Sequence, residues 1–312
     1  MATQGFFRSR SWKTVARSIL SISTSSIVLS LSSLTAPAIA GDPFRSENPH
    51  DIGDKTERAF EAFFRDGHYP NAKTYIDEAL DSEGEDPIVP AMKASLIYLE
   101  DPDELPEEFQ TYAAQTLSSA ETLVETDALR GNLYLAIGHF LEGAYVLKRD
   151  GLVNGIPTAL NKLQKVFEHL DRAGDINSTD PELNIIKGYM DLLLATNLPF
   201  ANPERPIERL SEYAAPEYLA KRGLAVGFRD LERLDEAMEA VERSLELTPN
   251  NPEVMYLKAQ IYVEKGEHAT SLEWFDRALE MKDQLLEDLV RQIQRERDKA
   301  SREVEANNTD AP

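Results

Sequence analysis

Residues 252–285 read PEVMYLKAQIYVEKGEHATSLEWFDRALEMKDQL, and the residues before them carry the same pattern at a fixed offset of 34 positions. At each compared position a small residue matches a small one, and a large apolar residue matches a large one. The pairs are Ala225, Phe228, Ala237, Val241, Ser244 and Leu245 with Ala259, Tyr262, Ser271, Phe275, Ala278 and Leu279. An internal period of this length predicts a repeat architecture of stacked helical hairpins.

A third copy lies near the start of the body. Phe63, Gly67, Ala72, Ile76, Ala79 and Leu80 each stand 199 positions before Tyr262, Gly266, Ser271, Phe275, Ala278 and Leu279. Prolines followed by glutamate mark the expected starts of three first helices, at Pro181, Pro216 and Pro252. Proline suits the first helical turn because the N–H it lacks has no intrahelical partner there, and glutamate favours the positive end of the helix.

This pattern resembles the tetratricopeptide repeat, most closely in Tyr262-x-x-x-Gly266-x-x-x-x-Ser271-x-x-x-Phe275-x-x-Ala278-Leu279. The resemblance covers residues 181–283 well and the rest of the body loosely, and the whole chain is similar to exported repeat proteins of cyanobacteria. It implies an all-α, right-handed superhelix of about six helix hairpins plus a C-terminal capping helix.

The resemblance also implies a binding face, because the first helices of this family line a concave surface that holds a peptide or a partner's helix. A negative edge of three glutamates beside apolar anchors would favour a basic, partly apolar segment of another exported protein. The alternative is that the glutamates only complement helix N-termini. Carried over by position, the face comprises Glu182, Ile185, Tyr189, Glu217, Ala220, Leu224, Glu253, Tyr256 and Gln260. The family's clamp for a C-terminal carboxylate uses Lys, Arg and Asn, and the acids here argue against it.

Hydrophobic periodicity extends the helical prediction over the whole body. The expected helices cover residues 55–66, 70–81, 88–99, 105–125, 128–149, 157–172, 181–195, 204–213, 217–231, 235–247, 253–265, 269–281 and 284–303. The repeat that begins at Pro216 also predicts an inter-helix turn two residues longer than its neighbour's. The expected organisation is a signal peptide (1–40), a flexible lead-in (41–54), divergent helical repeats (55–180), repeats closer to the family pattern (181–283), a capping helix (284–305) and a disordered tail (306–312).

Residues 1–40 differ in composition from the rest. Four basic residues up to Arg17 precede an apolar run over residues 19–34, and the segment ends in the small residues Ala38 and Ala40. This order is typical of a signal peptide cleaved after Ala40. A membrane anchor and a transit peptide are alternatives, but Ser and Thr dilute the apolar run and the small-residue end favours secretion. We therefore expect an exported protein in the periplasm, with the thylakoid lumen or secretion as alternatives, and with no stable membrane span after cleavage.

Composition narrows the function classes. The 312 residues include 33 basic and 55 acidic side chains, a net charge of -22, and no Cys. Cleavage after Ala40 would remove four positive charges and leave -26. Such an acidic chain cannot neutralise a run of phosphates, which excludes a dedicated nucleic-acid binder. The absence of Cys excludes disulfides, thiolate metal sites and cysteine nucleophiles.

Catalytic motifs are missing from the sequence, which has no Gly-rich phosphate loop and no nucleophile elbow. We therefore expect no enzyme and no cofactor. His139 and Glu142 stand one turn apart in an apolar stretch, but no second His shares that face, so we interpret His139 as a core residue and predict no metal site. The leading hypothesis is a non-enzymatic scaffold or assembly factor. The alternative is an acidic protein that handles Ca²⁺ or Mn²⁺ through carboxylates such as those of residues 101–108.

Overall fold

The computed structural model describes residues 41–101, 105–197 and 202–309, and within these residues every regular element is a helix. Consecutive helices pack in pairs, so the predicted all-α architecture of six hairpins and a final helix is confirmed. The hairpins are α2 (Asp54–Phe60) and its π-helical continuation η1 (Glu61–Asp66) with α3 (Tyr69–Glu83); α4 (Ile88–Glu100) with α5 (Glu107–Leu123); the two arms of α6 (Ala128–Ile176); α7 (Pro181–Asn197) with α8 (Glu204–Glu212); α9 (Glu217–Asp230) with α10 (Leu234–Leu247); and α11 (Pro252–Glu264) with α12 (His268–Glu280). A short 3-10 turn, η2 (Lys282–Gln284), leads to α13 (Glu287–Thr309).

The third hairpin lies within α6, where Gly151 interrupts the helix. Its φ of 72° and ψ of 171° fall in a region that is open essentially to glycine alone. The chain folds back there, since a Cβ added to Gly155 would lie 3.0 Å from the carbonyl oxygen of Val146. The sequence predicted this break as the gap between residues 149 and 157.

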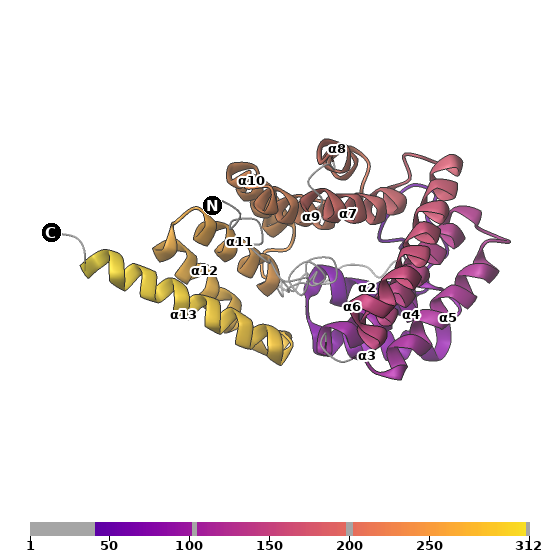
Figure 1. Cartoon of the computed structure of the whole chain (residues 1–312), viewed down its shortest axis with the longest axis horizontal. Helices are drawn as coiled ribbons and strands as arrows, with labels where there is room; N and C mark the ends of the chain where they lie inside the picture. Colours follow the sequence, from indigo (N-terminus) through magenta and orange to yellow (C-terminus); the bar gives the residue numbers. More distant parts are fainter. Residues whose placement is uncertain (1–40, 102–104, 198–201, 310–312) are drawn as a thin grey trace, which may run out of the picture.

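The repeats curve so that the first hairpins face the last ones. Figure 1 shows α13 at one end of the molecule and α4, α5 and α6 gathered at the other, with α7, α9 and α11 between them. The curvature is closed by a buried hydrogen bond in which the Tyr69 hydroxyl donates to the Glu253 carboxylate, 184 positions away. The first and the fifth and sixth hairpins therefore enclose a common interior.

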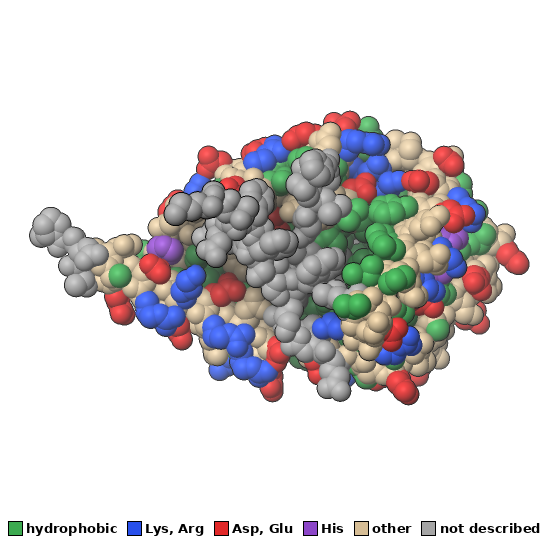
Figure 2. Space-filling view, in the orientation of Figure 1, with side chains coloured by type: hydrophobic (Ala, Val, Ile, Leu, Met, Phe, Trp, Pro, Cys, Tyr) green, Lys and Arg blue, Asp and Glu red, His purple; other side chains and the backbone are tan. Residues whose placement is uncertain are grey.

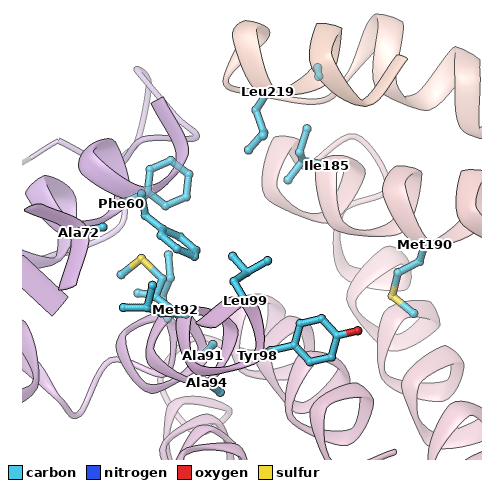
Figure 3. Packing of buried hydrophobic residues seen from close by; sticks show 14 of the residues in the cluster. Phe60, Ala72, Ala91, Met92, Ala94, Tyr98, Leu99, Ile185, Met190 and Leu219 are labelled. Atoms are coloured by element: carbon cyan, nitrogen blue, oxygen red, sulfur yellow. The ribbon is translucent and has the colours of Figure 1, made fainter. Parts of the chain in front are cut away.

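The core is continuous from α2 to α13. Figure 3 shows the Phe60 side chain beside Met92 where the first two hairpins meet, and Leu99 on the side of α4 that faces Ile185 and Leu219. Close packing needs small residues at the crossings: a Cβ on Gly227 of α9 would lie 2.2 Å from a methyl carbon of Leu192 in α7. This is the role that the small repeat positions predict.

Three expectations are corrected. The turn between α9 and α10 (residues 231–233) is as long as that between α11 and α12 (residues 265–267), because α9 begins one residue after Pro216 and is one residue longer than α11, which begins at Pro252 itself. The lead-in expected to be flexible is packed, with Phe44 and Ile52 buried. The tail expected to be disordered from residue 306 continues α13 as far as Thr309. The predicted signal peptide, with its cleavage residues Ala38 and Ala40, lies outside the described residues.

Candidate functional site

A pocket of about 80 Å³ opens where the first helices of the last two hairpins meet α13 and the N-terminal hairpins. Its walls combine leucine and valine side chains with two arginines, two glutamines and two tyrosines. The lining residues are Tyr69, Leu99, Arg222, Val226, Arg229, Glu253, Tyr256, Leu257, Gln260, Leu286, Asp288, Leu289 and Gln292.

Glu253 forms one wall of this pocket. It is the second residue of α11, whose N-cap Asn251 accepts hydrogen bonds from the backbone N–H groups of Glu253 and Val254 at 3.0 and 2.9 Å. Its carboxylate accepts hydrogen bonds from Arg222 of α9 and from Tyr69 of α3, and all three side chains are buried. A buried carboxylate requires such partners, because an unpaired charge in the interior costs several kcal/mol.

Arg222 lies on the same wall and keeps one unused donor. Its Nη2 donates to Glu253, while its Nη1 is buried and has no hydrogen-bond partner within the described residues. A buried donor without a partner costs about 1–3 kcal/mol. An acceptor oxygen brought to this atom would therefore gain more free energy than one placed at an exposed donor.

Tyr256 lines the pocket one turn after Glu253 on α11, in an amide network. Its hydroxyl accepts from Gln260 Nε2 at 2.8 Å and from Gln292 Nε2 of α13 at 2.9 Å. Burial and the neighbouring Glu296 hold the pKa of Tyr256 well above its ordinary value. The hydroxyl therefore stays protonated, so Tyr256 contributes a neutral ring and a hydrogen-bonding group rather than a nucleophile.

Arg229 completes the polar lining. Its Nη1 donates to Gln260 Oε1 at 2.7 Å, and its Nη2 pairs with Asp230 at 2.9 Å. The guanidinium is therefore fixed between α9 and α11. Together the groups around the pocket offer fixed donors and an apolar floor, an arrangement suited to binding a side chain and its peptide group.

Of the nine residues predicted for a concave binding face, the structure brings Glu253, Tyr256 and Gln260 to the pocket. Glu182 is instead fully buried at the other end of the repeat array, where it accepts from the Tyr134 hydroxyl at 2.8 Å and pairs with Arg45 at 3.0 Å and Arg130 at 3.3 Å. The expected edge of three exposed glutamates is therefore not formed, because Glu182 and Glu253 both neutralise arginines of the chain itself.

The other predicted positions have packing roles. Ile185, Ala220 and Leu224 are buried in the core. Tyr189 is partly buried and donates its hydroxyl proton to the carbonyl oxygen of Leu219 at 2.7 Å. Glu217 is exposed and pairs with Arg243 of its own hairpin at 2.8 Å.

The sequence did not indicate the partners that come from distant segments. Tyr69 gave no signal, since nothing in the repeat spacing relates it to Glu253. The sequence does place two charged residues, Arg222 and Lys258, at a first-helix position where the tetratricopeptide pattern usually has leucine. His169 was also missed: the return arm of α6 places its ring 5.7 Å from that of His139, between centroids. Burial, followed by the charge of His139, lowers the pKa of His169.

Within the described parts of the chain, no three His, Asp or Glu side chains are arranged to hold a metal ion. The acidic run at residues 101–108 is described only in part, since residues 102–104 lie outside. Among the described residues, no helix is both long enough and apolar enough to cross a membrane.

Comparison with known families now adds to this geometry. Residues 208–285 match the model of the tetratricopeptide repeat. The hairpins of this segment are therefore similar to tetratricopeptide repeats. The match covers α9 to α12, the helices that carry most of the pocket wall, so the repeats supply its scaffold.

Among solved structures, the chain is similar to one in the crystal structure of the APC/C hetero-tetramer Cut9–Hcn1, with a TM-score of 0.39 and 13% sequence identity. The alignment covers 79% of this chain and 48% of that one, so this chain spans about half the length of that protein. No curated protein sequence matches it.

Proposed function

We propose that this protein is a non-enzymatic scaffold or assembly factor that is exported and binds another exported protein through its tetratricopeptide repeats. The observation that carries the proposal is the pocket between α9, α11 and α13, whose polar groups come from the successive first helices α9 and α11, from α13 and from α3. Export is supported by the basic, apolar and small-residue order of residues 1–40. The mass of the exported protein tests it: a chain that begins at Gly41 supports export, and one that retains Met1 contradicts it.

The pocket suggests what the partner inserts. At about 80 Å³ it is smaller than the roughly 300 Å³ or more of a small-molecule site, so it suits one side chain of a larger partner. The floor of Val226, Leu257 and Leu289 favours an aliphatic group, and Arg222 Nη1 suits a neighbouring carbonyl oxygen. Since Glu253 already holds Arg222, a basic residue of the partner gains little from this glutamate.

Filling the pocket tests this proposal without removing core contacts. Val226→Phe places a ring in the pocket, and Val263→Phe is the matched control, because Val263 is a partly buried valine of α11 outside the lining. Proteins captured from extracytoplasmic extract by the mature chain are identified, and the affinity of each purified candidate is measured by calorimetry. We expect Val226→Phe alone to weaken binding about tenfold or more. Equal affinities of the two variants would place binding elsewhere.

The cation-handling alternative stays a prediction. Calorimetry of the mature chain with Ca²⁺ and with Mn²⁺ tests it, since a built site gives a saturable heat that survives physiological salt, whereas surface carboxylates give weak heats that salt screens.

A further inference from the structure

The backbone nitrogen of Gly41, where the lead-in begins, is held against α2. Its N–H donates to a carboxylate oxygen of Glu57 at 3.0 Å. The approach is close, since a Cβ added at Gly41 would lie 2.8 Å from the other oxygen of the same carboxylate. The glycine therefore allows the nitrogen of residue 41 and this carboxylate to meet without displacing the Glu57 side chain.

The Glu57 carboxylate has no side-chain counter-ion among the described residues. Its only hydrogen bond there is the one from the Gly41 N–H, and it forms no ion pair with a basic side chain. Charged side chains beside it are paired elsewhere: Arg58 with Glu78 at 3.2 Å, and the next acid along the chain, Glu61, with Arg65 at 2.8 Å. The position is half-buried, so a cation placed at Gly41 would be partly protected from solvent.

The residues that follow Gly41 are fixed in the interior. The Asp42 side chain is buried, accepts hydrogen bonds from the backbone N–H groups of Phe44 at 2.8 Å and His50 at 3.1 Å, and pairs with Arg45 at 2.9 Å. Arg45 is itself held by two acids at the start of α7. The nitrogen of residue 41 is thus already positioned, and little conformational entropy remains to be lost when a stronger contact forms there.

We propose that cleavage after Ala40 creates an ion pair between the new α-ammonium group of Gly41 and the Glu57 carboxylate. The inference rests on the export proposed above. A signal peptidase hydrolyses the Ala40–Gly41 peptide bond: water supplies the hydroxyl that makes Ala40 a carboxylic acid and the hydrogen that makes the Gly41 nitrogen an amine. An α-amino group has an ordinary pKa of about 7.7–8.0, so it takes up a proton at neutral pH. The neutral hydrogen bond becomes a charge-assisted one, which is roughly twice as strong. Export processing therefore stabilises the junction between the lead-in and α2.

A general attraction has to be separated from this specific pair. The chain has a net charge of -22, and Figure 2 shows acidic side chains spread over the face in view. A positive charge at many places on this molecule would be stabilised to some degree. The variant Glu57→Gln removes the specific partner. The matched control is Asp54→Asn, which neutralises an exposed carboxylate in the same turn of α2.

Three chains prepared to begin at Gly41 test the proposal: the native sequence, Glu57→Gln and Asp54→Asn. Each is compared with its N-terminally acetylated form, because acetylation keeps an N–H donor on Gly41 and removes the charge. Urea unfolding is measured at pH 6.5, where the free amino group is protonated, and circular dichroism checks each fold. We expect acetylation to raise the unfolding equilibrium constant about threefold to fivefold in the native sequence and in Asp54→Asn, and to leave it unchanged in Glu57→Gln.

A second measurement needs no variant. In the native chain the pKa of the Gly41 α-amino group, followed by NMR, should lie above its ordinary range because the carboxylate favours the charged form. Three results would overturn the ion pair: an α-amino pKa within the ordinary range, equal stability of the free and acetylated native chains, or an acetylation effect that persists in Glu57→Gln. Each of them leaves the proposed export standing, since these chains are made to begin at Gly41. An exported protein with a different first residue would contradict the proposed cleavage, and the ion pair with it.

Discussion

Glu182 and Glu253 occupy the same position after a helix-initiating proline, and the molecule uses them differently. Glu182 lies where the lead-in meets α6 and α7, bound by Tyr134, Arg45 and Arg130 with no exposed surface. Glu253 lies beside an open pocket, and its partner Arg222 keeps a donor without a hydrogen bond. Within the described residues, Arg130 Nε beside Glu182 is likewise buried without a hydrogen-bond partner, so the two junctions differ in that Arg222 and Glu253 line a pocket and Glu182 does not.

The two junctions also differ in how much charge they bury. Around Glu182, Arg45 pairs with Asp180 at 2.7 Å as well, and Arg130 pairs with Asp86 at 3.1 Å. Burial acts to lower the pKa of Arg45, but Glu182 and Asp180 outweigh it and raise that pKa. The junction therefore fixes the lead-in to the third and fourth hairpins through several charges, while at the pocket the Glu253 carboxylate pairs with Arg222.

The largest expected effect is that of Glu182→Ala. The change removes the carboxylate that Arg45 and Arg130 share and leaves both guanidinium groups in the interior. We therefore expect the free energy of unfolding to fall by about 3–5 kcal/mol. Urea unfolding followed by circular dichroism measures it. A loss below about 1 kcal/mol would mean that solvent already reaches this junction.

Glu253→Gln should have a smaller effect, because the amide keeps the shape and accepts one hydrogen bond. Arg222 loses its counter-ion, and we expect a loss of about 1.5–3 kcal/mol in the same unfolding experiment. If Glu253→Gln costs more than Glu182→Ala, the contrast between the two junctions is wrong. Tyr69→Phe serves as a control that removes only one donor.

Asp66, the last residue of η1, should make stability sensitive to pH. Burial raises its pKa to about 6, with Arg65 lowering and Glu61 raising it. The pKa of Asp66 is higher in the folded state than in the unfolded state, so the folded state binds the proton more tightly and loses stability when the carboxyl ionises. The free energy of unfolding should therefore fall as pH rises from about 4 to 6. Asp66→Asn should remove this dependence and gain about 1 kcal/mol at pH 7, after allowance for partial exposure. Unfolding at pH 4, 5, 6 and 7 measures it, and an unchanged slope in the variant would contradict it.

The smallest effect should come from Glu217, the third glutamate of the series. It is exposed and pairs with Arg243 on the surface, so Glu217→Gln should change the free energy of unfolding by at most about 0.5 kcal/mol. A loss comparable to that of Glu253→Gln would show that the position of the glutamate after the proline, rather than its burial, determines its contribution to the free energy of unfolding.

The sequence predicted the helices and their pairing because those depend on local periodicity. The sequence also contains a spacing that relates three first helices. In the structure a lysine of each helix pairs with an acidic residue sixteen positions earlier: Lys93 with Asp77 at 2.5 Å, Lys187 with Asp171 at 2.5 Å and Lys258 with Glu242 at 2.8 Å. This spacing aligns α4 with α7 and α11, and so places a divergent hairpin in register with the repeats.

The candidate site was less predictable, for a physical reason. The position of Tyr256 and Gln260 follows from repeat spacing, and so does the helix start at Glu253. The burial of Glu253 does not, because it depends on Tyr69, which is 184 residues away. The prediction that Glu182 lies on the binding face is wrong for the same reason, since Arg45 of the lead-in pairs with it in the interior.

The contact between Tyr69 and Glu253 also affects how the array folds. Repeats that touch only their neighbours unfold in pieces, and their stability is a sum of local contributions. Here the first hairpin shares buried groups with the last two, so part of their stability exists only when the chain between them is also folded. The closed curve therefore makes unfolding more cooperative than in an open array of the same length, and damage at either end reaches the pocket.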